Sequence, residues 1–416
     1  MKNHDDEPSL EGAPPGHGVI PLEQPALPAS RADGRDRYLD TLRAVALARV
    51  VAFHSFSGAV WLSLVFPSMG VMFALAGSLM ARSLKRPAAG VLKSRTRRLL
   101  LPLWAYAIIV LGLLFVAGWR PWHEDEASWQ NIALWFFPIG VPPYPEDAGT
   151  TSFLADSTWG FQAEEILWYI RAYFWFMLLS PLLLKAFRRF PRVTLLAPLL
   201  LLVALNQETA VPLPDWANSP VTDFATYGSC WILGFAHHDG LLRKLRLPAV
   251  IALALALMAL GLSWAASHLG EEGWNLNDIP LAQALWSLGF CAVLLRLSPV
   301  WPALPGPMRV LDGVVTLKNN RAITIYLWHN LLLVAAVPLI DLGWANPFLS
   351  ETIPWLLGSD WLLFLTVWPL LGIIILCLGW VEDFAAGRTP RLWYSGSGTL
   401  APRVSGPRPG GPPHQY

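Results

Sequence analysis

The sequence predicts an all-α polytopic membrane protein with about ten transmembrane helices and both termini in the cytoplasm. Apolar residues make up 54% of the 416-residue chain and charged residues only 14%, whereas soluble domains typically contain roughly 25% charged residues. Apolar runs alternate with short polar loops, and many runs have the ~17–25 residues that a helix needs to cross the bilayer core. This composition excludes a disordered chain, a coiled coil and an ordinary cytosolic enzyme.

Ten apolar runs define the predicted membrane spans. The fifth and sixth runs are shorter than the others, and the fifth contains Pro198. The runs lie near residues 40–62, 65–81, 99–118, 166–187, 193–206, 222–236, 247–267, 280–297, 321–341 and 360–380.

The two ends of the chain differ in composition from its apolar middle. The first thirty or so residues contain many prolines and acids and lack the basic and apolar pattern of a signal peptide. The last residues are rich in Gly and Pro. We therefore expect a disordered cytoplasmic tail over 1–34, a ten-helix membrane domain over 35–385 and a Pro/Gly-rich cytoplasmic tail over 386–416.

The distribution of Lys and Arg predicts the orientation, because cytoplasmic loops carry an excess of these residues. The loop 82–98 contains seven of them and no acid, while four intervening loops contain only Arg120 between them. These four loops are 119–165, 207–221, 268–279 and 342–359. The alternation places both termini inside. The net charge of the whole chain is +1, so we expect no nucleic-acid partner.

The loop 119–165 is the largest predicted extracytoplasmic segment, and it is both acidic and aromatic. Its acids include Glu124, Asp125, Glu126, Glu146, Asp147 and Asp156, and its aromatic residues include Trp119, Trp122, Trp129, Trp135, Tyr144 and Trp159. Aromatic residues are typical of membrane interfaces, so one interpretation is an aromatic belt with a folded cap. The alternative is a platform whose aromatic faces stack on a sugar ring.

Several familiar sites are absent from the sequence, which contains no P-loop, GxGxxG, GxSxG or HExxH motif. Three scattered cysteines exclude a disulfide framework and a cysteine zinc site. The segment His237-His238-Asp239 is interpreted as a solvated loop, because no partner ligands are evident. We expect no metal site.

Ionisable residues inside apolar spans are candidates for function, because charges are costly there. In the first span His54 follows Arg43 by eleven positions, so both lie on nearly one helix face about 16 Å apart along the axis. Arg49 points about a third of a turn away. Arg43 would hold the phosphates of a cytosolic donor while the His54 imidazole acts as a general base. Alternatively, Arg43 reaches lipid headgroups and His54 bonds to a neighbouring helix.

The basic loop leads into the third span with Arg95 and Arg98 at i, i+3 spacing on one helix face. Two guanidinium groups in this arrangement can hold phosphates with bidentate hydrogen bonds. The alternative is that they only add to the positive charge of a cytoplasmic loop.

Two further spans carry ionisable residues. Arg171, near the outer end of the fourth span, either reaches Glu164 or Glu165 or offers a donor to an acceptor from outside. In the ninth span His329 places a second imidazole in the bilayer, one turn after Tyr326. Alternatively, His329 forms a hydrogen bond that serves only the structure.

Five short motifs occur in a fixed order along the chain. They are Arg43 followed by His54, the segment Phe73-Ala74-Leu75-Ala76-Gly77, the pair Arg95 and Arg98 ahead of a Leu-Pro sequence, the stretch 167–184, and Tyr326-Leu327-Trp328-His329. Their order, spacing and sidedness resemble the acyltransferase-3 family of integral membrane acyltransferases. The resemblance covers about residues 35–385 and includes ten helices with both ends inside.

The resemblance implies transfer of an acyl group, often acetyl, from cytosolic acyl-CoA to a hydroxyl of a sugar, glycolipid or secondary metabolite. It places His54 and Arg43 at the family's essential histidine and its partner arginine, and Arg95 and Arg98 where the CoA phosphates are held. We assign Arg171, Tyr326 and His329 to substrate binding. Acyl-CoA would be a substrate, and no permanently bound cofactor is expected.

Two departures from the family pattern affect this interpretation. Ala76 stands where many members have Ser, which argues against a role for a hydroxyl there. No esterase-like extracytoplasmic domain follows the last span, so the chain would complete the transfer itself or rely on a separate extracytoplasmic partner.

The alternative class is a transporter or flippase, or a non-catalytic exporter of acylated glycans, because ten spans with few buried charges would also serve these roles. Pro67, Pro181 and Pro198 interrupt spans without forming a matched pair, which favours the enzyme. The sequence leaves open the acyl chain length, the acceptor, the oligomeric state and the choice between a general base and an acyl-histidine relay.

Overall fold

The computed structural model describes residues 36–56, 59–121, 129–145, 158–207, 212–270 and 273–391. Within these ranges the regular secondary structure is helical, apart from an isolated bridge between Gly270 and Gly273 and a single bridge residue at Thr158. The predicted all-α class is therefore confirmed.

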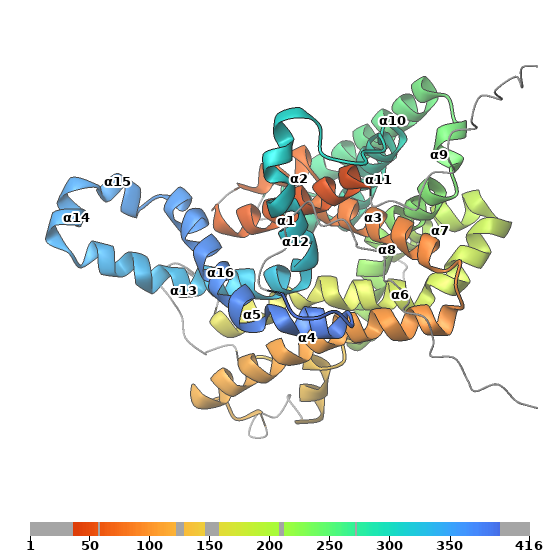
Figure 1. Ribbon diagram of the computed structural model, residues 1–416. Helices are drawn as coiled ribbons and strands as arrows, with labels where there is room; N and C mark the ends of the chain where they lie inside the picture. The colour runs from red at the N-terminus through yellow and green to blue at the C-terminus, as the bar shows by residue number, and fades with distance from the viewer. Residues whose placement is uncertain are drawn as a thin grey trace, which may run out of the picture. The chain divides into compact units, whose positions relative to one another are not determined.

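The longer helices overlap the ten predicted runs (Figure 1), although the first helix ends at Ser55 and the third begins at Ala88, inside the predicted loop 82–98. They are α1 (Arg37–Ser55), α3 (Ser68–Ser83), α4 (Ala88–Val116), α6 (Leu167–Arg189), α7 (Pro191–Leu205), α8 (Asp215–His238), α10 (Leu247–Ala266), α11 (Pro280–Arg296), α13 (Ala322–Trp344) and α16 (Asp360–Ala385). Short helices connect them: η1 (Ala59–Trp61), α2 (Leu62–Val65), η3 (Trp129–Trp135), α5 (Trp159–Glu165), α9 (Leu241–Lys244), η4 (Leu276–Asp278), η5 (Gly306–Leu311), α12 (Asp312–Asn320), α14 (Pro347–Thr352) and α15 (Pro354–Leu357).

Six helical segments of the described chain are long and apolar enough to cross a membrane. They are Ala59–Ser83, Ala88–Val116, Trp159–Arg189, Leu247–Ala266, Ala322–Trp344 and Asp360–Ala385. Two more apolar helices, α7 and α11, are shorter. Helix α1 is not among the six, since Asp40, Arg43 and Arg49 make it more polar than an ordinary span. The chain is a multi-pass membrane protein, and the count of ten spans stays a prediction.

Local sequence explains where several helices begin. Helix α1 follows Asp36, whose side chain accepts the backbone N–H of Tyr38 at 3.0 Å. Helix α16 follows Ser359 in the same way. Helix α7 begins with Pro191, which has no N–H to leave unpaired in a first helical turn.

Helices α3 and α8 form the closest crossing in the core. A β-carbon on Gly77 would lie 2.1 Å from the carbonyl oxygen of Trp231, and one on Gly234 would lie 2.1 Å from that of Ala74. Small residues allow helix backbones to approach in this way. Around this pair, α7 and α11 pack against α8, and α10 packs against α11.

The N-terminal half of α1 is held by α12. Arg37 donates to the carboxylate of Asp40 at 3.1 Å, and it also pairs with Asp312. Asn319 donates to the backbone oxygen of Asp40 at 2.8 Å and accepts from Arg43 at 3.0 Å. These contacts fix the end of α1 that carries Arg43.

Helices α13 and α16 form a hairpin held by buried charge at the start of α13. Arg321 and Asp383 pair at 2.7 Å, and both side chains are almost completely buried. Glu382 accepts the backbone N–H groups of Ile323 at 2.9 Å and Thr324 at 3.2 Å. The free N–H groups at a helix start favour such a carboxylate.

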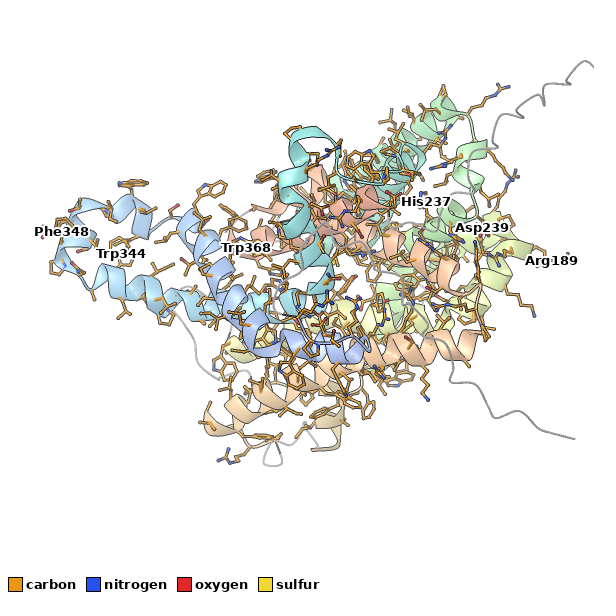
Figure 2. All side chains as sticks on the ribbon, viewed as in Figure 1. Arg189, His237, Asp239, Trp344, Phe348 and Trp368 are labelled. Atoms are coloured by element: carbon orange, nitrogen blue, oxygen red, sulfur yellow. The ribbon has the colours of Figure 1, made fainter. Side chains whose placement is uncertain are left out.

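The other end of this hairpin carries α14 and α15 (Figure 1). Trp344 and Phe348 lie at this end (Figure 2), and both side chains are exposed. Exposed aromatic residues of this kind are typical of contact with lipid or its interface.

We predict that Gly77→Ala destabilises the protein by about 1–3 kcal/mol, because the new methyl group would overlap a backbone carbonyl that cannot move without separating α3 from α8. The measurement is thermal unfolding in detergent. The matched control is Gly112→Ala on α4, where a β-carbon would meet open space. Equal melting temperatures for the two variants would contradict the close crossing.

Candidate active site

Two cavities lie near α1 and are lined by different chemistry. The first, of about 670 Å³, is lined by Arg43, Arg86, Arg95 and Arg98 and is called the arginine cavity. The second, of about 420 Å³, contains His54 and is called the histidine cavity. Its polar lining also includes Arg49, Glu165, Thr222, Asp223, Thr226, Asn275, Asn277 and Asp278. Both volumes fall in the range of small-molecule sites.

The arginine cavity gathers four guanidinium groups. Arg95 donates to the hydroxyl of Tyr173 at 3.0 Å and to that of Ser83 at 2.8 Å, so its head group is held in place. Arg98 is exposed and lies three positions further along α4 on the same wall. No Asp or Glu occurs among the described residues that line this cavity. Such a site favours a polyanion.

Sequence reasoning missed Arg86 as a site residue. It belongs to the same basic loop as Arg95 and directly precedes the Pro87 that caps α4. The positive charge of this loop therefore included Arg86. The i, i+3 spacing that singled out Arg95 and Arg98 applies only within a helix, and Arg86 lies ahead of the helix. Ala76 also lines this cavity, so no hydroxyl is present where many family members have Ser.

Four aromatic side chains, named the aromatic partition, separate the two cavities: Phe73, Tyr169, Tyr227 and Tyr326. Tyr169 lines the arginine cavity, Tyr227 lines the histidine cavity and Tyr326 lines both. Phe73 is completely buried, with its ring centroid 4.8 Å from that of Tyr169 and 5.1 Å from that of Tyr227. The rings of Tyr169 and Tyr326 are 4.9 Å apart. Tyr326 is therefore the described residue at which the two cavities meet.

Two imidazoles face each other beside this partition. The rings of His54 and His329 lie 5.2 Å apart with an interplanar angle of 63°. The Nδ1 of His329 lies 2.6 Å from the backbone oxygen of Tyr326, which can only accept, so Nδ1 carries a hydrogen. Its Nε2 is buried and finds no partner in the described part of the chain. A neutral His329 thus presents a lone pair at Nε2.

His54 is partly exposed and lines the histidine cavity. Across the ranges given above it makes no hydrogen bond, and its ring contacts are with Phe53 and His329. An imidazole that is held by ring contacts, and whose nitrogen atoms make no hydrogen bond to described residues, is available to take a proton or to act as a nucleophile.

Arg171 lies behind the histidine cavity. Its Nη2 pairs with Asp223 at 2.7 Å, and its side chain is buried. Asp223 lines the cavity and Arg171 does not. Asp223 is absent from the predicted site, although it is an ionisable residue at the start of the predicted sixth span and therefore met the same criterion as the other candidates.

Several described aromatic residues of the 119–165 loop pack into the protein, although Phe137 is exposed. Trp135 is completely buried and donates to the backbone oxygen of Pro143 at 2.9 Å, and Trp119 stacks on Phe115. These residues, Tyr144 and Trp159 line neither cavity, which favours the folded cap. The side chain of Trp129 and several further residues lie outside the described residues. These are Trp122, Glu124, Asp125, Glu126, Glu146, Asp147 and Asp156.

The interpretation of His237 as part of a solvated loop is wrong. His237 lies in the last turn of α8 (Figure 2), and its ring nitrogen atoms bond to Ser78 and Ser298 at 3.0 Å each. Asp239 pairs with Arg188 through two bonds of 3.0 Å. Both groups therefore hold helices together. No set of three or more His, Cys, Asp or Glu is placed to hold a metal ion in the described ranges.

Comparison with known proteins gives one match. Residues 36–381 match the model of the acyltransferase 3 family, which is described as an acyltransferase domain. The chain matches no curated protein and no solved structure. The family match covers most of the chain and includes both cavities and the helices that form them. The chain therefore belongs to the acyltransferase 3 family and is a membrane acyltransferase.

Proposed function

We propose that the protein transfers an acyl group, in the simplest case acetyl, from cytosolic acyl-CoA to a hydroxyl of a sugar, glycolipid or secondary metabolite. One observation carries this proposal. A cavity lined by arginines and a polar cavity that contains His54 share one lining residue, Tyr326. Family membership favours this function over a transporter or an exporter.

The arginine cavity is the proposed donor site. CoA carries its negative charge on phosphates, and Arg95 and Arg98 with Arg43 would pair with them. Arg86 adds a fourth cation at the same wall. The basic loop that supplies three of these residues is predicted to be cytoplasmic, as are both termini, so acyl-CoA would enter from the cytosol.

His54 is the proposed catalytic residue, and two chemical courses are open to it. For either course the thioester of the donor would reach past Tyr326 toward His54. As a general base His54 removes the acceptor's hydroxyl proton, the oxygen attacks the thioester carbon, and the C–S bond breaks while the protonated imidazole gives its proton to the sulfur, so that CoA leaves as the thiol. As a nucleophile its ring nitrogen attacks the thioester carbon, and the C–S bond breaks to release the CoA thiolate. The acyl group then passes to the acceptor oxygen, and the acceptor's hydroxyl proton ends on the CoA sulfur. The lone pair at His329 Nε2 can accept a hydrogen bond from a protonated His54, which supports either course.

The histidine cavity is the proposed acceptor site. Carboxylates, amides and hydroxyls line it, as a polyhydroxylated acceptor requires for hydrogen bonding. With this arrangement the chain completes the transfer without a separate extracytoplasmic partner, and Arg171 positions Asp223 in the cavity wall.

We expect acetyl-CoA to raise the melting temperature of the detergent-purified protein, and Arg95→Ala/Arg98→Ala to abolish this shift. A ligand at 100 times its Kd adds about 2.7 kcal/mol to the stability of the folded state. His54→Ala should retain the shift, because His54 lies in the other cavity. The exposed Arg192→Ala is the matched control. A shift that survives in the double variant would contradict the assignment of the donor site.

His54→Ala should lower acyl transfer by roughly 10²–10⁴-fold, the usual contribution of a general acid–base group. Release of the CoA thiol in native membranes that contain the acceptor is the measurement. His329→Ala should cause a smaller loss, since His329 acts on His54 and is buried. A folded His54→Ala variant with full activity would exclude both chemical courses.

Tyr326 provides a test of the partition. Tyr326→Phe keeps the ring and loses only the hydrogen bond to the backbone oxygen of Ile166 at 2.8 Å, so we expect activity within about tenfold of the original, as loss of a single hydrogen bond implies. Tyr326→Ala joins the cavities and should admit water to the thioester, raising CoA release without acceptor. Equal acceptor-independent release in the two variants would show that Tyr326 does not separate the sites.

A further inference from the structure

The histidine cavity contains a cation for which the proposed mechanism has no use. Arg49 lies on α1 between Arg43 and His54 and lines the histidine cavity, not the arginine cavity. Its guanidinium carbon lies 4.9 Å from the centre of the Phe53 ring, and that ring in turn contacts the His54 ring at a centroid distance of 5.4 Å. This places a positive charge beside the proposed reacting group.

The Arg49 guanidinium has no anionic partner among the described residues. Its Nε and Nη2 are buried and make no hydrogen bond within those residues. Buried guanidinium groups elsewhere in the chain behave differently, since Arg171 pairs with Asp223 and Arg321 pairs with Asp383. An unpaired charge in such surroundings is unfavourable. An anion in the cavity would remove this penalty.

The carboxylates of the same cavity already have donors of their own. Asp223 pairs with Arg171, and Asp278 accepts from the amide of Asn275 at 2.8 Å. Glu165 accepts from the amide of Asn330 at 3.3 Å. These groups can still accept hydrogen bonds from hydroxyls of a bound molecule, while Arg49 offers N–H donors to an anion.

We propose that the acceptor carries an anionic group, a carboxylate or a phosphate, and that Arg49 binds it. This inference rests on the proposed function, because it assigns the histidine cavity to the acceptor. The anion would lie next to His54 and orient the acceptor, so that one of its hydroxyls faces the imidazole. The resulting class of acceptor is an acidic or phosphorylated sugar in place of a neutral one.

The test uses thermal shift titrations of the full chain with glucose, glucuronate and glucose 1-phosphate at matched ionic strength. We expect at least one anionic sugar to bind more tightly than glucose. Arg49→Met should weaken that binding by about 10- to 100-fold, as expected for hydrogen bonds to a charged group, and Arg49→Lys should restore part of it. The exposed Arg192→Met is the control. A response to glucuronate alone identifies a carboxylate, and a response to glucose 1-phosphate alone identifies a phosphate.

Three results would overturn the inference. They are equal binding of glucose and the anionic sugars, binding of the anionic sugars that persists in Arg49→Met, and no shift with either anionic sugar. An acetyl-CoA titration of the same samples reports separately on the proposed function, because it depends on Arg95 and Arg98. Loss of turnover in Arg49→Met with unchanged anionic-sugar binding would instead indicate a role on the reacting carbonyl, and it also contradicts the inference.

Discussion

The backbone crossing of α3 and α8 at Gly77 and Gly234 is the contact on which the site depends. Without β-carbons at these positions the helices come close enough for Phe73, one turn before Gly77, to pack against Tyr227 on α8 and Tyr169 on α6. Those rings, with Tyr326, form the partition. A wider crossing would separate the rings and join the two cavities, because interiors tolerate little change in spacing.

The distribution of buried charge complements this geometry. Two buried arginines near the cavities are paired with carboxylates. Arg171 pairs with Asp223 and holds α6 to α8, and Arg321 pairs with Asp383 and holds α13 to α16. Helix α1 instead carries Arg43 into one cavity and Arg49 with His54 into the other. Its polar residues explain why it is too polar for an ordinary span. Among the described helices, α1 is the one that contributes arginine or histidine side chains to the lining of both cavities.

The chemistry of the two cavities suits a reaction between molecules of different character. Guanidinium groups, with no carboxylate among the described residues of the lining, favour a polyanionic donor on one side of the partition. Amides, hydroxyls and paired carboxylates favour a hydroxylated acceptor on the other. His54 lines the second cavity and its ring contacts that of His329, so the proposed reacting group is separated from the arginine residues that are proposed to hold the donor's phosphates.

The sequence by itself determined the helical class, the positions of the ten longer helices and the candidate residues on α1, because apolar periodicity and the helical repeat are local properties. It also singled out Arg95 with Arg98 and Tyr326 with His329. Only the tertiary structure decided that Arg43 and His54 line different cavities, that Arg171 pairs with Asp223, and that His237 holds α3 to the segment after α11. These outcomes depend on which helices pack together, and side-chain partners far apart in the chain leave no local pattern.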